Sequence, residues 1–140
     1  MINMVVLIGN LGRDPEVGVT TNNRHYARLS LATSVTWRDK VTGEKRERTE
    51  WHRIVAWGDG ISGMLSKYAK KGSKLYVQGK LSTRKYEKNG TEHWTTEVVV
   101  QGADTSIRLL GDAGSGVPPP PEEEPDGRWA EYDMEQGRYE

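Results

Sequence analysis

Residues 49–58, with the sequence TEWHRIVAWG, constrain the fold of this chain more than any other stretch. Their β-branched and aromatic side chains, followed by a glycine, predict a β-strand. Because side chains alternate along a strand, Trp51, Arg53 and Trp57 are expected to share one face. Arginine is almost never fully buried without a partner, which indicates that this face is open. The alternative is that both indoles pack in a core and only Arg53 reaches solvent.

Alternation of apolar residues predicts the other elements. In residues 24–34, Ala27, Leu29 and Leu31 form the expected inward set, and Tyr26, Arg28 and Ser30 form the outward set. A helix should follow this strand, with Asp59 as its N-cap and an apolar stripe of Ile61, Met64, Leu65 and Tyr68. The dipeptide Asn89-Gly90 predicts a tight hairpin. The predicted strands are residues 2–11, 24–34, 49–58, 75–82 and 92–101, with a last apolar piece at 107–110.

The first predicted strand is apolar on both faces. Val5 and Leu7 alternate with Val6 and Ile8. In a small barrel only one of these faces can be buried in the strand's own core. We therefore expect a second copy of the chain to cover the other face.

Charge is divided unevenly between a body and a tail. Residues 1–111 hold 18 Lys and Arg against 11 Asp and Glu, a formal charge of +7. Residues 112–140 hold 2 against 9, a formal charge of −7. A basic body favours a polyanionic partner. The tail is rich in Gly, Pro and Glu, so we expect two parts: a folded domain at 1–111 and a disordered linker and acidic tail at 112–140.

Several classes of protein are disfavoured by what the sequence lacks. Without cysteine there is no disulfide or thiolate metal site, which fits a reducing cytosol. Histidines 25, 52 and 93 have no metal-ligand spacing, and no phosphate-binding loop is present. A membrane span or secretory leader is not indicated by any apolar run. We therefore expect that the chain is not an enzyme and that it binds no metal or cofactor.

Basic residues occur together with aromatic residues in three places. A flat, anionic ligand with exposed π-faces, such as single-stranded nucleic acid, suits such pairs. The predicted element order, with one helix between the third and fourth strands, is that of the OB-fold, a five-stranded Greek-key barrel. The three groups are Trp37 with Arg38 and Lys40, Trp51 with Arg53 and Trp57, and Arg84 and Lys85 with Tyr86.

Five stretches closely resemble the bacterial single-stranded DNA-binding protein family. They are residues 7–17, 34–44, 49–58, 81–86 and 95–100, and the resemblance extends from residue 1 to about residue 110. It implies an all-β OB-fold homotetramer that coats single-stranded DNA in replication, recombination and repair, in the cytoplasm at the nucleoid. A module of the same fold that contacts proteins instead of DNA is the alternative.

The resemblance also implies roles for individual residues. The base-stacking positions of the family fall on Trp37, Trp51, Trp57 and Tyr86. Phosphate contacts are expected from Arg38, Lys40, Arg53, Arg84 and Lys85. Subunit contacts are expected at His52, Lys74 and Tyr76, beside Val6 and Ile8 of the first strand.

The tail departs from the family pattern. Many members end in a run of Asp followed by Pro-Phe, which docks partner proteins. This chain ends in EQGRYE after a short linker. Docking of replication and repair proteins through the tail is therefore expected to be altered or absent.

Overall fold

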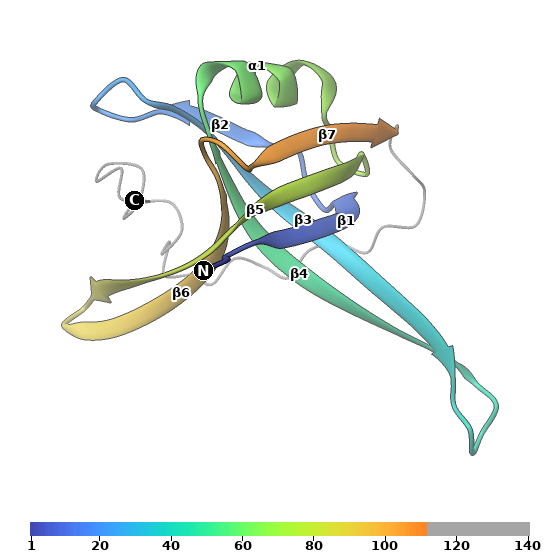
Figure 1. The fold of residues 1–140 in the computed structure, drawn as a ribbon. Helices are drawn as coiled ribbons and strands as arrows, with labels where there is room; N and C mark the ends of the chain where they lie inside the picture. The colour runs from blue at the N-terminus through green and yellow to red at the C-terminus, as the bar shows by residue number, and fades with distance from the viewer. Residues whose placement is uncertain (112–140) are drawn as a thin grey trace.

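The computed structural model describes residues 1–111, which form seven β-strands and one helix (Figure 1). The predictions for residues 112–140, a disordered linker and an acidic tail, lie outside the described residues. The elements are β1 (Val5–Leu11), β2 (Glu16–Val19), β3 (His25–Arg38), β4 (Lys45–Trp57), α1 (Asp59–Tyr68), β5 (Lys74–Lys88), β6 (Thr91–Val100) and β7 (Ser106–Gly111).

Five of the strands close into a ring. The order along the sheet is β1-β3-β4-β6-β5, and β5 pairs in turn with β1. The β4–β6 pairing is parallel, and the other pairings are antiparallel. In sequence the helix lies between β4 and β5, which are the third and fourth of the five ring strands along the chain. The predicted five-stranded barrel is therefore confirmed. Two further strands lie outside the five-stranded ring: β2 pairs with β3, and β7 pairs with β5.

The interior of the ring holds the apolar residues that the alternation predicted. Leu29 and Leu31 of β3 are buried there with Ile54 of β4 and Leu75 and Val77 of β5. On β1, Val5 and Leu7 pack against this core, while Val6 and Ile8 remain exposed. The ring thus uses one face of each of its strands for its own core.

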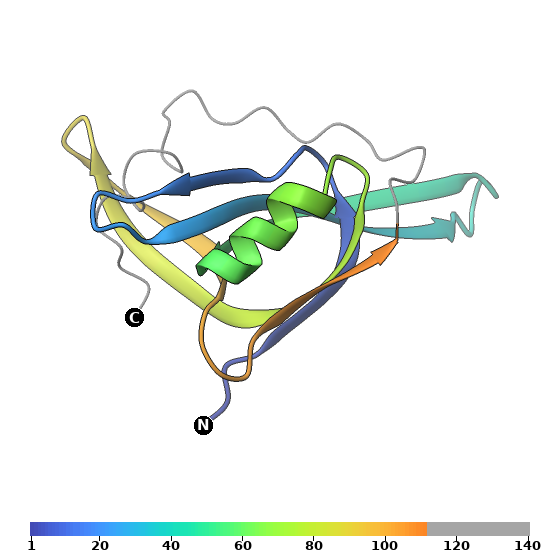
Figure 2. The same ribbon diagram turned by 90° about the horizontal axis from the view of Figure 1, so that it is seen from above.

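The helix α1 lies across one end of the barrel and packs against β3, β4 and β2 (Figure 2). Leu65 is fully buried in the core, as predicted, but Tyr68 is 58% exposed. Its place in the core is taken by Ala69, just after the helix. The N-cap prediction is also wrong, because Gly58, at φ 123°, is the N-cap and Asp59 is the first helical residue.

Two glycines allow neighbouring strands to approach closely. A Cβ atom on Gly9 would lie 2.1 Å from the backbone oxygen of Ala32, and one on Gly79 would lie 2.7 Å from that of Val99. Real Cβ atoms do not approach backbone oxygens so closely. Gly9 on β1 and Gly79 on β5 therefore permit the strand crossings that close the barrel.

Two hairpins extend from the barrel in different directions (Figure 1). The β3–β4 arm stays paired as far as Arg38 opposite Lys45, so both strands extend beyond the predicted bounds of 24–34 and 49–58. Its polar pairs keep this ladder regular, as in the 2.9 Å contact between the Ser34 and Thr49 hydroxyls. The β5–β6 hairpin turns at Asn89 and Gly90, both with positive φ, as predicted.

Residues 1–111 contain neither a membrane-spanning helix nor a metal-ligand cluster. No helix in this part of the chain is long and apolar enough to cross a membrane. Nor does this part contain a group of three or more His, Cys, Asp or Glu side chains that could hold a metal ion.

Candidate nucleic-acid interface

One face of the curved sheet, on the side away from the barrel core, carries five of the nine predicted binding residues. Residues paired directly across two strands point to the same face. One continuous surface therefore runs across β3, β4, β6 and β5. On it Tyr26 of β3 is paired with Trp57 of β4, Val55 of β4 with Val99 of β6, and Thr95 of β6 with Arg84 of β5. We call it the aromatic face, and define it by Tyr26, Trp51, Arg53, Trp57, Arg84 and Tyr86.

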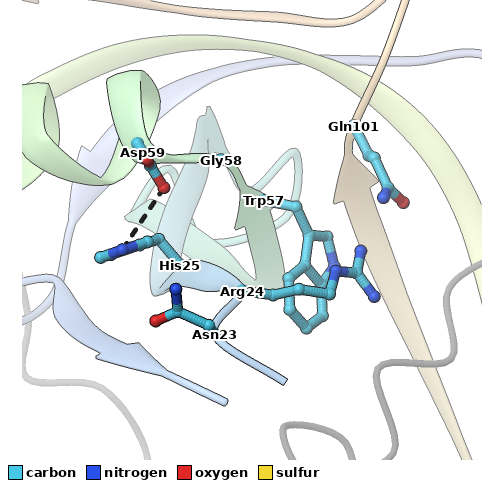
Figure 3. Close-up of a pocket in the computed structure, with 7 residues that line it drawn as sticks. All are labelled: Asn23, Arg24, His25, Trp57, Gly58, Asp59 and Gln101. Atoms are coloured by element: carbon cyan, nitrogen blue, oxygen red, sulfur yellow. Dashed lines mark ion pairs between the residues drawn. The ribbon is translucent and has the colours of Figure 1, made fainter. Parts of the chain in front are cut away.

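Trp57 lies in a small apolar cluster at the centre of this face. It packs with Val55 and Val99, separately from the barrel core, and its ring is tilted against Tyr26 at a centroid distance of 5.9 Å. The Arg24 guanidinium lies 4.2 Å from the Trp57 ring centroid (Figure 3). Trp57 is 5% exposed. The expectation of an open surface is therefore wrong for this ring in the present conformation.

A pocket of about 310 Å³ lies beside Trp57. The N-terminus of α1 borders it, and the His25 ring is 3.4 Å from the Asp59 carboxylate there (Figure 3). A pocket with an arginine over an indole suits an anionic group attached to a flat ring. Its lining is Asn23, Arg24, His25, Trp57, Gly58, Asp59 and Gln101.

Trp51 and Arg53 are half-buried on the same face of β4. The Arg53 Nη1 atom donates a hydrogen bond to Thr95 Oγ1 at 3.2 Å, which links β4 to β6 across the face. Trp51 is opposite Ala32, a small residue that leaves the indole room on this side of the arm. The predicted sharing of one face by these residues is confirmed by the register.

Arg84 and Tyr86 form the β5 part of the aromatic face. Arg84 Nη2 donates a hydrogen bond to Glu97 Oε1 at 3.0 Å, and the Glu97 side chain is fully buried. Tyr86 is 3% exposed and stacks on the His93 ring at 5.3 Å. The buried carboxylate fixes the position of Arg84 and offsets part of its positive charge.

Lys85 does not lie on the aromatic face. Successive residues of a strand point to opposite sides, so the predicted group of residues 84–86 is divided by the hairpin. The Lys85 Nζ atom is 2.5 Å from Glu92 Oε1 and 6.0 Å from the Trp94 ring centroid. Trp94 is 64% exposed on this side.

The third predicted group lies at the end of the β3–β4 arm. Trp37 is 47% exposed, and its pairing with Arg46 puts it on the opposite side of the arm from Trp51. Arg38 lies at the end of β3, and Lys40 is exposed in the turn. The predicted group is therefore divided: Trp37 is separate from the aromatic face, whereas Arg38, paired with Lys45, lies on the same side of the arm as Trp51.

Asp39 holds the turn of the arm together. Its Oδ1 atom accepts hydrogen bonds from the backbone N–H groups of Val41, at 2.8 Å, and Thr42, at 3.2 Å. These two bonds, with a smaller contribution from Arg46, hold the pKa of Asp39 below its usual value. An ionised Asp39 thus fixes the loop that carries Lys40.

The predicted subunit contacts fall in two places. Val6 is 50% and Ile8 51% exposed, and Ile8 is opposite Tyr76 on the outer surface of β1 and β5. Lys74, opposite Asn10, continues this surface. His52 lies on β4, where its Nε2 atom is 2.7 Å from Thr33 Oγ1 and its partial burial lowers its pKa.

Three residues on or beside this face were not among the predicted binding residues. The alternation of residues 24–34 already placed Tyr26 and Arg28 outward, and that signal could have identified them. Arg24 precedes β3, where no periodic pattern applies. Its position over Trp57 depends on the tertiary fold.

The model of the family described as "Single-strand binding protein family" matches residues 2–109. The single-stranded DNA-binding protein of Rickettsia typhi is 48% identical over 115 residues, which cover 81% of this chain and 76% of that protein. The Rhizobium meliloti protein of the same name is 42% identical over 137 residues, covering 95% and 79%.

Two solved structures are similar to this fold. One is the Plasmodium falciparum SSB in complex with single-stranded DNA, with a TM-score of 0.71 and 34% identity over 79% of this chain and 96% of that one. The other is a deletion mutant of the Thermus aquaticus single-stranded DNA-binding protein, with a TM-score of 0.63 and 27% identity. It is covered over 51% of its length, against 79% of this chain.

Proposed function

This chain belongs to the single-strand binding protein family, and from that premise we propose that it coats single-stranded DNA with little sequence preference. We propose that it acts as a binding protein, without catalysis, in replication, recombination and repair, at the nucleoid in the cytoplasm. The observation that carries the proposal is the aromatic face, where indole and phenol rings from β3, β4 and β5 lie together with guanidinium groups.

Base stacking is the proposed source of affinity without sequence preference, because every base has a π-face. Trp51, Trp57 and Tyr86 are proposed to stack bases on the aromatic face, and Trp37 to stack one at the arm. The magnitude, about 1–3 kcal/mol per stacked base, is one established on single-strand binding proteins themselves.

Binding on the aromatic face requires local rearrangement. A base that stacks on the covered side of Trp57 displaces the Arg24 guanidinium, which now lies 4.2 Å from the ring centroid. The released guanidinium can then pair with a phosphate of the same strand. Exchange of an arginine–ring contact for an arginine–phosphate contact costs little, because the cation keeps an attractive partner throughout.

Phosphates are proposed to bind the cations that flank these rings: Arg38, Lys40, Arg53, Arg84 and Lys85. The formal charge of +7 on residues 1–111 supports this role. Binding of single-stranded DNA through phosphate contacts weakens as salt rises. The plot of log K against the logarithm of salt concentration has a slope of about −0.7 for each phosphate contact.

Titration of tryptophan fluorescence with poly(dT) tests the proposal. Bases stacked on indoles should quench the emission, and Trp51→Ala should weaken binding by about 1–3 kcal/mol per site. Trp57→Ala removes a buried ring, so its folding should be checked by circular dichroism and Trp57→Phe used beside it. Unchanged affinity when Trp37, Trp51 and Trp57 are replaced together in a folded protein would favour the module that contacts proteins instead of DNA.

We further propose that residues 1–111 are the DNA-binding domain and that it works as a homotetramer. The half-exposed Val6 and Ile8 on β1 support this, with Lys74 and Tyr76 beside them on β5 and His52 on β4. Sedimentation at micromolar concentration tests it, and a stable monomer would contradict it. The tail, residues 112–140, is proposed as a separate region with altered or absent docking of replication and repair proteins.

A further inference from the structure

The β5–β6 hairpin carries an aromatic side chain on each of its two sides. Tyr86 lies on the aromatic face, and Trp94 lies on the other side. We call this other side the reverse face. It is formed by Leu81, Thr83, Lys85, Trp94 and Thr96, which the register places together.

Trp94 is not accounted for by packing within residues 1–111. It is 64% exposed, and Leu81 on the same side is 50% exposed. Between them the Thr83 and Thr96 hydroxyls bond to each other at 3.0 Å, so this part of the hairpin surface is polar. An exposed indole on a regular two-stranded ribbon presents its ring to solvent or to a ligand.

A cation lies beside this indole. The Lys85 Nζ atom is 6.0 Å from the Trp94 ring centroid and 2.5 Å from Glu92 Oε1. Lys85 is also one of the residues that the sequence predicts to hold a phosphate. Lys85 and Tyr86 point to opposite sides of β5, so a single DNA strand that contacts both residues must pass around the hairpin.

The hairpin leaves room for such a path. Beyond Gly79, β5 is paired within residues 1–111 only with β6, and the β4–β6 pairing begins at Ile54 opposite Val98. Residues 82–97 therefore form a two-stranded ribbon that projects from the barrel (Figure 1). A ligand that follows one side can reach the other at the ribbon edge.

We propose that Trp94 and Lys85 form a second nucleotide-binding subsite, so that single-stranded DNA contacts both sides of the β5–β6 hairpin. A base stacks on the Trp94 indole, and the adjacent phosphate pairs with the Lys85 ammonium. Glu92 competes with that phosphate for Lys85. This inference rests on the proposed function and extends it to a surface that the predicted binding residues did not include as a stacking site.

Three substitutions at one position separate stacking from other roles of Trp94. Trp94→Phe keeps an aromatic ring, Trp94→Leu keeps apolar bulk without one, and Trp94→Ala removes both. Tyr68→Ala is the matched control, because Tyr68 is 58% exposed and has the Lys67 ammonium 5.2 Å from its ring, but lies on α1. Binding is measured by anisotropy of labelled oligo(dT) strands of about 4 to 16 nucleotides, the site-size range of one such barrel.

Stacking predicts that affinity for the longer strands falls about 5- to 100-fold with Trp94→Ala and with Trp94→Leu, and much less with Trp94→Phe. The shortest strands should lose less, because they can bind the aromatic face alone. Tyr68→Ala should bind like the unmodified protein. Glu92→Gln should tighten binding at low salt, and Lys85→Ala should lower the salt slope by about 0.7 per site.

The contrary results are equally specific. The subsite would be overturned if the three Trp94 variants bound long strands with the same affinity as one another. It would also be overturned if Tyr68→Ala lost as much affinity as Trp94→Ala. A changed sedimentation coefficient with unchanged DNA affinity would make Trp94 a subunit contact and also overturn it. Failure of the proposed function is distinct, since the unmodified protein would then not bind oligo(dT) of any length.

Discussion

At the scale of single residues, glycine has two opposite roles in this chain. Gly9 allows β1 to pass close to β3, because a Cβ atom there would lie 2.1 Å from the Ala32 backbone oxygen. Gly63 lies inside α1, and a Cβ atom there would meet nothing within 4 Å. The first glycine is required by packing, and the second only makes the helix less stable.

We predict opposite effects for the two alanine substitutions. Gly9→Ala should lower the free energy of unfolding by about 1–3 kcal/mol or more, because the backbone of β3 must move. Gly63→Ala should raise it by about 0.5–1 kcal/mol, because alanine loses less conformational freedom in a helix. Urea unfolding followed by circular dichroism measures both. A Gly9→Ala protein as stable as the unmodified one would show that the crossing of β1 and β3 is looser than described.

A second residue-scale prediction concerns His52. Desolvation lowers its pKa below the ordinary 6.5, and the Glu50 charge opposes this to a smaller extent. The folded protein therefore binds fewer protons at this site than the unfolded chain. The stability that His52 contributes is complete above about pH 6.5 and is lost as the pH falls below it.

The unfolding temperature should therefore fall between about pH 8 and about pH 5, and less steeply in His52→Gln. Glutamine has no titrating group and its amide can still bond the Thr33 hydroxyl, which lies 2.7 Å from His52 Nε2. Differential scanning fluorimetry across this range compares the two proteins. Equal pH dependence would show that other groups carry the acid sensitivity.

At the scale of elements, the apolar alternation was sufficient to predict the ring strands and their inward residues. Ala27, Leu29 and Leu31 are buried as expected, because each lies on the one face that the barrel covers. Strand β2 gave no such signal. It has four residues, mostly exposed, and its structure comes from pairing with β3. A strand held by a non-local ladder leaves little trace in its own sequence.

The side of the sheet on which a binding residue lies was predictable only where the alternation of side chains along a strand was taken into account. Trp51, Arg53 and Trp57 share a face because they are separated by even numbers of residues, two and four. Arg84 and Lys85 were grouped by sequence proximity, but adjacent strand residues point to opposite sides. The burial of Trp57 beneath Arg24 depends on a contact between distant residues, which local pattern cannot reveal.

The β3–β4 arm allows a prediction that separates binding from stability. Asp39→Ala removes the hydrogen bonds from Val41 and Thr42 that hold the turn, and its 3.5 Å contact with Arg46. DNA would then have to order the tip on binding. Affinity for poly(dT) should fall by about 0.5–1.5 kcal/mol for each side chain that has to be ordered. The unfolding temperature should change little, because the tip lies beyond the barrel core.

Val41→Ala is the control for this experiment. Val41 lies in the same turn, is 92% exposed, and its side chain makes none of these hydrogen bonds. Its substitution should leave both affinity and unfolding temperature unchanged. If Asp39→Ala binds no more weakly than Val41→Ala, the turn does not need to be pre-formed for binding.

At the scale of the whole molecule, charge is separated along the chain. Residues 1–111 carry a formal +7, and residues 112–140, which lie outside the described residues, carry −7. Both are parts of one chain, and we expect this tether to hold the tail carboxylates at a high effective concentration around the body. Phosphates and carboxylates bind the same guanidinium and ammonium groups.

We therefore predict that removal of residues 112–140 tightens single-strand binding at low salt. The competing carboxylates are then absent, so fewer contacts must be broken before phosphates bind. The effect should vanish near 1 M salt, where the Debye length is about 3 Å and such competition is screened. Oligo(dT) affinities of the full chain and of residues 1–111, measured across a salt series, test this. A variant with the tail's Asp and Glu changed to Asn and Gln controls for chain length, and should behave like the truncated protein. If the truncated protein binds with unchanged affinity at low salt, the tail does not compete with DNA, and its charge serves another purpose such as solubility.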